Sequence, residues 1–141
     1  MIENKLKSIN PKNNIILSSW NVPSVNDIDI IINKTAKAQT DWCKIDLISR
    51  LDFVKNLSHI LNERANELSL LMADEIGKPI KQGKGEIKKC AWLCDYYYKN
   101  SEQILSDKHV RTEFYESYIS YRPIGLVLGI MPWNFPFWQV F

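Results

Sequence analysis

The amino-acid sequence predicts an α/β fold to which this chain contributes mainly α-helices, a short β-hairpin and one buried strand. Apolar residues recur every three or four positions over long stretches between Ser24 and Leu105, which is typical of amphipathic helices. Residues 116–122 alternate and are rich in β-prone side chains, as expected for a surface strand. Residues 124–131 form an apolar run, interrupted by glycine and too short for a core helix, which predicts a fully buried strand.

Length and composition are those of an ordinary globular domain. A chain of 141 residues with 45% hydrophobic and 24% charged residues can build a core of its own. The 18 basic and 16 acidic residues are well mixed, so the formal charge of +2 gives no electrostatic reason to expect nucleic acid as a partner. Three cysteines argue against a disulfide framework and favour the reducing cytoplasm.

The N-terminal part of the chain divides into a polar stretch and a helical stretch. We expect residues 1–14 to be loosely ordered, since they are polar and lack the apolar core of a signal peptide. The helical part spans 15–115 and opens with a short strand at Ile15–Leu17. Ser24 is a candidate helix cap, and the helix that it begins should end near Asp41–Trp42.

Two further helical regions follow. The first runs from about Asp46 to Ile76, with an interruption expected at 62–66 because thirty unbroken residues would be long. Gly77 is the expected left-handed cap at its end, and the next helix covers about 80–105. The predicted buried positions of the first region are Leu47, Leu51, Val54, Leu57, Leu61, Leu68, Leu71 and Met72.

The last part of the chain, residues 123–141, is predicted to be a strand, a turn and the start of a helix. Pro132 lacks an N–H donor and ends the strand, and Trp133 and Asn134 form the turn. Pro136 then suits the first turn of a helix. In α/β sheets such a turn lies at the carboxyl ends of the strands, which is where ligands bind.

The segment Pro132-Trp133-Asn134-Phe135-Pro136, after an apolar strand opened by Pro-Ile-Gly, resembles the aldehyde dehydrogenase superfamily. The triplet Gly77-Lys78-Pro79 recurs in that family as well. The resemblance implies that 123–141 is the first strand of a Rossmann-type cofactor domain, and that the chain is the N-terminal portion of a longer enzyme. It also implies that 116–122 is an oligomerisation strand.

The resemblance implies a site at the turn. The side-chain amide of Asn134 would donate to the oxyanion that forms when a thiolate attacks the aldehyde. NAD or NADP would contact the turn largely through backbone, and the substrate tunnel would be bordered by two side chains. The cofactor contacts would be Ile130, Met131, Pro132, Trp133 and Asn134, and the tunnel residues would be Phe135 and Gln139.

The expected activity is oxidation of an aldehyde to its carboxylate with NAD or NADP, in a cytoplasmic dimer or tetramer of identical chains. Within the family the sequence looks most like bacterial succinate-semialdehyde dehydrogenases. The nucleophilic cysteine of the family lies downstream of the Trp-Asn turn, whereas Cys43, Cys90 and Cys94 precede it. We therefore expect these 141 residues to be inactive alone.

Two residue patterns allow other interpretations. Cys90 and Cys94 lie one helical turn apart and could face a metal, but no third and fourth ligand is nearby, so we predict buried thiols and no metal site. Lys78 could bind phosphate, but no glycine-rich loop precedes it, and a structural role is the better prediction.

A different class of function is also compatible with the sequence. The uncharged, aromatic residues 124–141 could be the docking or membrane tail of a small helical interaction module. Pro132, Asn134, Pro136 and Gln139 argue against a membrane span, since interior prolines and amides are costly in lipid.

Overall fold

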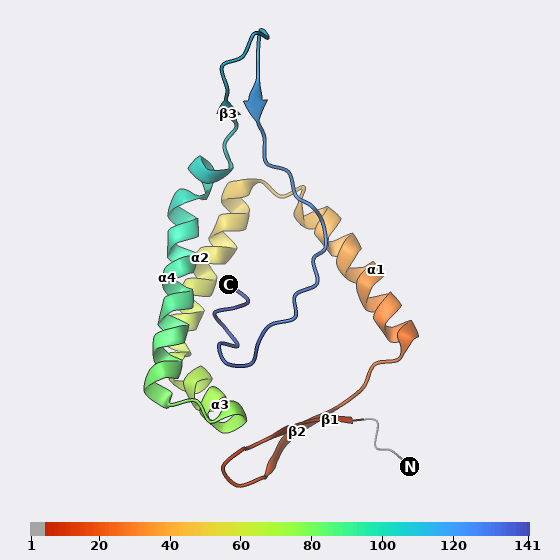
Figure 1. Ribbon diagram of the computed structural model, residues 1–141, viewed down its shortest axis with the longest axis vertical. Helices are drawn as coiled ribbons and strands as arrows, with labels where there is room; N and C mark the ends of the chain where they lie inside the picture. The colour runs from red at the N-terminus through yellow and green to blue at the C-terminus, as the bar shows by residue number, and fades with distance from the viewer. Residues whose placement is uncertain (1–4) are drawn as a thin grey trace.

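The computed structural model describes residues 5–141 and shows an elongated helical molecule with a hairpin at each end (Figure 1). Residues 1–4, part of the stretch expected to be loosely ordered, lie outside the described range. Helices α2 and α4 pack along each other, and α3 packs against α4 near one end. The elements are β1 (Lys5–Ile9), β2 (Ile16–Asn21), α1 (Val25–Trp42), α2 (Leu47–Glu63), α3 (Ala65–Ile76), α4 (Ile80–Leu105), β3 (Lys108–His109) and β4 (Tyr118–Ile119).

The N-terminal hairpin differs from the expectation of a loose segment. Strand β1 pairs antiparallel with β2, and β2 is longer than the predicted strand. The turn closes through Asn14 in a left-handed conformation (φ 59°), which asparagine tolerates better than most residues. Ser8 Oγ donates to Glu75 Oε1 at 2.9 Å and thereby ties the hairpin to α3. The polar composition of residues 1–14 suggested a loose segment, but Ser8 and Asn10 find hydrogen-bond partners in α3.

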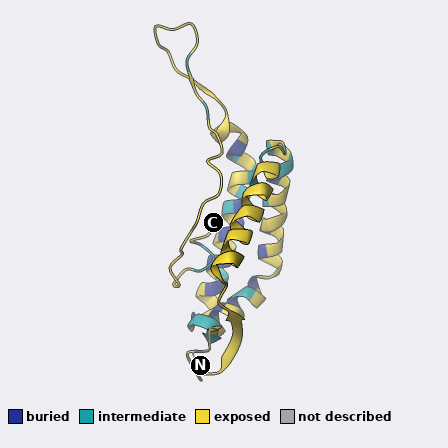
Figure 2. Cartoon of the chain, turned by 90° about the vertical axis from the view of Figure 1, so that its right-hand side faces the viewer, coloured by how far each residue is buried: buried dark blue, intermediate teal, exposed yellow. Residues whose placement is uncertain are grey.

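Helix α1 begins and ends where the sequence predicts. Ser24 and Asp27 form a capping box, in which the Ser24 side chain accepts from the Asp27 N–H and the Asp27 carboxylate accepts from the Ser24 N–H. No residue of α1 is buried (Figure 2), and the helix diverges from α2 and α4 beyond the contact of Trp42 with Phe53 (Figure 1). Its apolar stripe stays exposed, although Ile28, Ile31 and Ile32 line one cavity together with residues 126–128. Among residues 5–141, no helix has the length and apolar character that crossing a bilayer requires.

The core forms where α2 and α3 meet α4. The chain breaks at Arg64 between α2 and α3, and Gly77 ends α3 in the left-handed conformation (φ 69°), so both predictions are confirmed. Leu57 and Leu71 are exposed, contrary to the prediction. Leu71 lies on α3, after the break at Arg64, where the apolar stripe of α2 does not continue unchanged. The core residues are Leu61, Ala65, Met72, Ile87, Cys90, Ala91 and Cys94.

Helix α4 approaches α3 closely at Gly83. A Cβ added to Gly83 would lie 3.1 Å from Ser69 Cβ and 3.3 Å from Ser69 Cα. We expect Gly83→Ala to be less stable than Gly85→Ala by about 1–3 kcal/mol, the usual cost of overpacking. Gly85 is the matched control, because it lies on the same helix and a Cβ there meets nothing within 4 Å. Urea denaturation of the two variants measures the difference, and equal midpoints would contradict the close approach.

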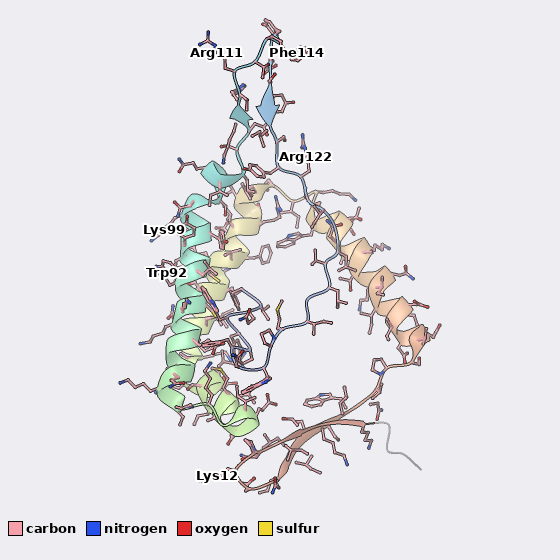
Figure 3. All side chains as sticks on the ribbon, in the orientation of Figure 1. Lys12, Trp92, Lys99, Arg111, Phe114 and Arg122 are labelled. Atoms are coloured by element: carbon pink, nitrogen blue, oxygen red, sulfur yellow. The ribbon has the colours of Figure 1, made fainter. Side chains whose placement is uncertain are left out.

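The second hairpin protrudes from the end of α4. Lys108–His109 pairs antiparallel with Tyr118–Ile119, so the strand expected over 116–122 is reduced to two residues. Arg111 and Phe114 lie at the tip and Arg122 at the base (Figure 3). The strand is short because beyond this pairing the hairpin finds no further strand among residues 5–141.

Residues 124–131 do not form the predicted buried strand. They run back from the hairpin in an extended conformation without a strand partner among the described residues, and they are exposed. The exposed fractions are 89% for Ile124, 85% for Leu128 and 88% for Ile130. The expected first strand of a cofactor domain is therefore absent here, since a buried strand needs neighbours on both edges and residues 5–141 supply none.

Candidate functional site

The chain after Pro132 folds into consecutive turns. The Gln139 N–H donates to the Phe135 carbonyl at 3.1 Å, and the Phe141 N–H donates to the Phe137 carbonyl at 3.4 Å. These are helix-like bonds, but residues 136–140 are turns rather than the regular helix that was predicted to begin at Pro136. The segment therefore forms helix-like turns but no regular helix.

The turns pack against the helical core. Phe137, Trp138 and Phe141 contact the cluster that includes Ile87 and Cys94. The Lys89 ammonium lies 3.5 Å from the centroid of the Trp138 ring, a favourable cation–π geometry. The terminal turns are therefore packed on the core, whereas residues 124–131 before them are exposed.

Glu86 of α4 binds the start of these turns. Its Oε1 accepts from the N–H groups of Phe137 at 2.9 Å and Trp138 at 3.0 Å. The first N–H groups of a helical segment have no partner within it, so a carboxylate at this position satisfies them and favours the local dipole. Glu86 is thus an N-terminal cap supplied from a different helix.

Lys78 binds the other side of the same turn. Its Nζ donates to the backbone carbonyl of Asn134 at 2.9 Å and also to Glu86 Oε2, and it lies 4.0 Å from the centroid of the Phe135 ring. Lys78 follows the left-handed Gly77, which ends α3 and turns the chain toward α4. The predicted structural role of Lys78 therefore includes holding the backbone of the residue expected to be catalytic.

The two charges are almost completely removed from water. The Lys78 side chain is 8% exposed and the Glu86 side chain 2% exposed. Burial of either charge alone would be costly, but each neutralises the other, and backbone groups of the turn satisfy the remaining positions. The pair and the turn therefore depend on each other.

The Asn134 side chain is exposed, and among residues 5–141 its amide has no hydrogen-bond partner. Asn134 lines a cavity of about 330 Å³ together with Trp133 and Phe135. The lining of this cavity also includes the segment Gly77-Lys78-Pro79. A neutral donor at the rim of a cavity, with its backbone held by a buried charge, is available to a ligand oxygen.

The other predicted site residues are brought together only in part. The backbone of 130–132 is extended and exposed next to the turn, and its N–H and C=O groups are unpaired within residues 5–141. Phe135 and Gln139 lie in the same turn, where the Gln139 N–H bonds the Phe135 carbonyl. The Phe135 ring packs on Lys78, whereas the Gln139 side chain is exposed.

No cysteine lines the cavity beside Asn134. Burial raises the pKa of the Cys90 thiol to about 11, with the Glu86 carboxylate as the second cause, and burial also raises the pKa of Cys94. A thiol with a raised pKa is a poor nucleophile at neutral pH. Cys43 lies at the end of α1 and accepts from Gln39 Nε2. Across residues 5–141, no three His, Cys, Asp or Glu side chains gather as a metal site would require.

Sequence reasoning missed Glu86. A signal was present, because Glu86 falls on the apolar face of its helix, between Gly83 and Ile87, and a carboxylate there needs a partner. Lys78 lies just before this helix, but a separation of eight residues across a helix start is not a helical spacing. Only the tertiary fold shows that both residues reach the same turn.

We expect hydrogen exchange to separate the two halves of the C-terminal segment. The amides of 124–131 should exchange rapidly, because they are exposed and unpaired within the described residues. The Phe137 and Trp138 amides should be protected, because Glu86 accepts both. Residue-resolved exchange measured by NMR tests this pattern. Equal, rapid exchange at all these amides would contradict the packing of the turns.

The arrangement has the fold of an aldehyde dehydrogenase. The structure of a succinic semialdehyde dehydrogenase from Streptococcus pyogenes, solved with NADP+, superposes with a TM-score of 0.89 at 24% identity, over 95% of this chain and 30% of that one. An aldehyde dehydrogenase from Brucella melitensis gives 0.88 at 22% identity, over 96% and 28%. The sequence model of the aldehyde dehydrogenase family matches residues 2–141, and this chain belongs to that family.

Two curated relatives with similar sequences are both succinate-semialdehyde dehydrogenases. The chain is 35% identical to the succinate semialdehyde dehydrogenase [NAD(P)+] Sad of Escherichia coli K12, over 94% of this chain and 29% of the relative. It is 31% identical to the succinate-semialdehyde dehydrogenase [NADP(+)] of Mycobacterium avium, over 95% and 29%. The chain thus spans about 30% of the length of the curated relatives it matches.

Proposed function

We propose that this chain is the N-terminal portion of an NAD(P)-dependent aldehyde dehydrogenase that oxidises succinate semialdehyde to succinate. The observation that carries the proposal is the anchored turn, which presents a free amide donor, Asn134, beside an exposed extended backbone. Similarity to relatives named for NADP(+) or NAD(P)+ and for succinate semialdehyde supports the cofactor and the substrate. The match over residues 2–141 includes the aromatic tail and favours the enzyme over a small interaction module.

Asn134 acts as an oxyanion donor in this proposal. Attack of a thiolate on the aldehyde carbon places negative charge on the carbonyl oxygen, and a fixed neutral donor stabilises that charge most when attack is complete. The Asn134 amide suits this role because it is exposed and unpaired among the described residues. Phe135 and Gln139 follow it in the same turn and border the substrate.

The residues before Asn134 fit a nicotinamide cofactor. The stretch 130–132 offers unpaired backbone donors and acceptors, and Ile130 and Trp133 offer exposed apolar surface beside them. This combination matches a ligand with an amide, ribose hydroxyls and a flat ring. When bound, the dinucleotide supplies the hydride acceptor. The part of this chain is to hold it through the backbone of Ile130, Met131, Pro132, Trp133 and Asn134.

The protruding hairpin supports assembly into a dimer or tetramer. Phe114 and Tyr115 are exposed at its tip, where no other part of residues 5–141 covers them. Exposed aromatic side chains at the tip of a protruding hairpin suit contact with another subunit. The three cysteines are unpaired, which supports the cytoplasm as the location.

Reduction of NADP or NAD with aldehydes tests the proposed function in the protein that carries this chain. We expect turnover with succinate semialdehyde to exceed turnover with an uncharged aldehyde of the same length. Comparable turnover of both aldehydes would contradict the substrate, and no turnover of either would contradict the proposed enzyme. Omission of the cofactor provides the blank.

We expect the 141-residue chain alone to give no turnover of any short aldehyde. Cys90 and Cys94 are buried thiols with raised pKa values, and Cys43 lies at the end of α1. Cofactor reduction is measured for this chain and for a variant in which all three cysteines are serine. Reduction that exceeds the blank and disappears in the serine variant would contradict the prediction.

A further inference from the structure

The buried Lys78–Glu86 pair contacts the turn on both sides of its exposed amide. Lys78 Nζ donates to the carbonyl of Asn134 itself, at 2.9 Å. Glu86 Oε1 accepts from the N–H groups three and four residues later, at 2.9 and 3.0 Å. Because the Asn134 carbonyl and side chain leave the same Cα, fixing the carbonyl limits where the side-chain amide can point.

The residues before the turn do not fix it with comparable hydrogen bonds. Within 5–141 the extended stretch 124–132 has no backbone hydrogen-bond partner, and Ile130 and Trp133 are exposed. In this structure the direction of the turn is therefore set from its C-terminal side. The contacts that set it come from α4, from the residue after Gly77 and from the aromatic packing of Phe137 and Trp138.

A charged pair does more here than apolar side chains of the same size could. Apolar side chains could fill the space with less desolvation, but they would leave one carbonyl and two N–H groups of the turn without these partners. Charge-assisted hydrogen bonds are short and directional, so they fix orientation. Such hydrogen bonds suit a turn whose side-chain donor must be placed to within about an ångström.

We propose that Lys78 and Glu86 are positioning residues for the reaction, and that the pair aims the Asn134 amide at the oxyanion through the backbone of the turn. This inference rests on the proposed function of Asn134. It adds two residues, on the α3–α4 turn and on α4, that contact the turn through its backbone N–H and C=O groups. Their effect on turnover should exist only while the Asn134 amide is present.

The test is a cycle of variants in the enzyme that carries this chain. Each variant of the Lys78–Glu86 pair, called a clamp variant below, is made in the natural background and in the Asn134→Ala background. The variants are Glu86→Gln, Lys78→Arg and the uncharged double variant Glu86→Gln/Lys78→Met. In the natural background we expect each to lower kcat by about tenfold to a hundredfold, as misplacement by about an ångström does. In the Asn134→Ala background we expect a further loss of less than about twofold.

Several outcomes would overturn the inference. Equal losses in both backgrounds would show that the pair acts through general structure, and unchanged kcat in the natural background would show that it positions nothing. Should Glu86→Gln not fold, the double variant and Lys78→Arg carry the same comparison, because neither leaves an unpaired buried charge. Lys81→Met and Glu102→Gln are exposed controls on α4 and should leave kcat unchanged.

The design separates this inference from the proposed function. Asn134→Ala alone tests the donor, and a loss below threefold would contradict the proposed function whatever the clamp variants do. A large loss from Asn134→Ala together with unchanged clamp variants would contradict only the positioning role. The KM for cofactor should stay within about twofold in the clamp variants, because most of the proposed cofactor contacts, Ile130, Met131 and Pro132, precede the turn.

Discussion

Replacing Asn134 by alanine should lower turnover of the enzyme by about a hundredfold to a thousandfold, or about 3 to 4 kcal/mol of barrier, as removal of one oxyanion donor does. The side chain is exposed and unpaired among residues 5–141, so its loss removes no internal contact. The turn is held through the Asn134 carbonyl, which alanine retains. Stability and cofactor affinity should therefore change little.

Turnover and the cofactor dissociation constant are measured together on the natural protein and on Asn134→Ala. Asn56→Ala, an exposed amide on α2, is the control and should match the natural protein in both. If turnover of the variant stays within threefold of that of the natural protein, Asn134 only shapes the turn and is not an oxyanion donor. A joint collapse of turnover and cofactor binding would show instead that the residue is structural.

The second large effect concerns stability. Lys78→Met should lower the free energy of unfolding by about 3–5 kcal/mol, because it leaves the 2% exposed Glu86 carboxylate without its cation. Glu86→Gln should cost a similar amount, because the buried ammonium then faces an uncharged amide. The double variant should cost less than either single one, since it buries no charge and Gln can still accept from the Phe137 and Trp138 amides.

Urea denaturation of the chain, followed by tryptophan fluorescence, measures the three free energies. Trp138, one of five tryptophans, contributes to the signal from the turn because it packs against the core. Lys81→Met is the matched exposed control and should shift the midpoint little. Additive losses in the double variant would mean that the two side chains stabilise the fold independently, and the pair would then not be a unit.

The helices were predictable because their signals are local. Ser24 and Asp27 form the capping box across three positions of the chain, and Gly77 adopts the left-handed conformation that lets glycine end a helix. The strand at 124–131 was not predictable in the same way. A buried strand depends on neighbours at both edges, and the apolar run indicates only what the segment would do if those neighbours were present.

The candidate site was predictable at the turn but not behind it. Asn134 and its neighbours follow from the Pro-Trp-Asn-Phe-Pro segment, whose residue types are rare in combination. Glu86 lies about fifty positions earlier in the chain, and its bonds to Phe137 and Trp138 exist only after α4 and the turn meet. Lys78 was recognised as structural, but its direct contact with the Asn134 carbonyl required the fold.

The unpaired segment 124–131 also affects how the chain behaves at high concentration. It is apolar and uncharged, and its backbone N–H and C=O groups are free within the described residues, so it can act as an edge on which another copy forms intermolecular β-sheet. Arg122 is the closest charge that could oppose such stacking. We expect aggregation of the 141-residue chain to accelerate steeply with concentration and to begin in this segment.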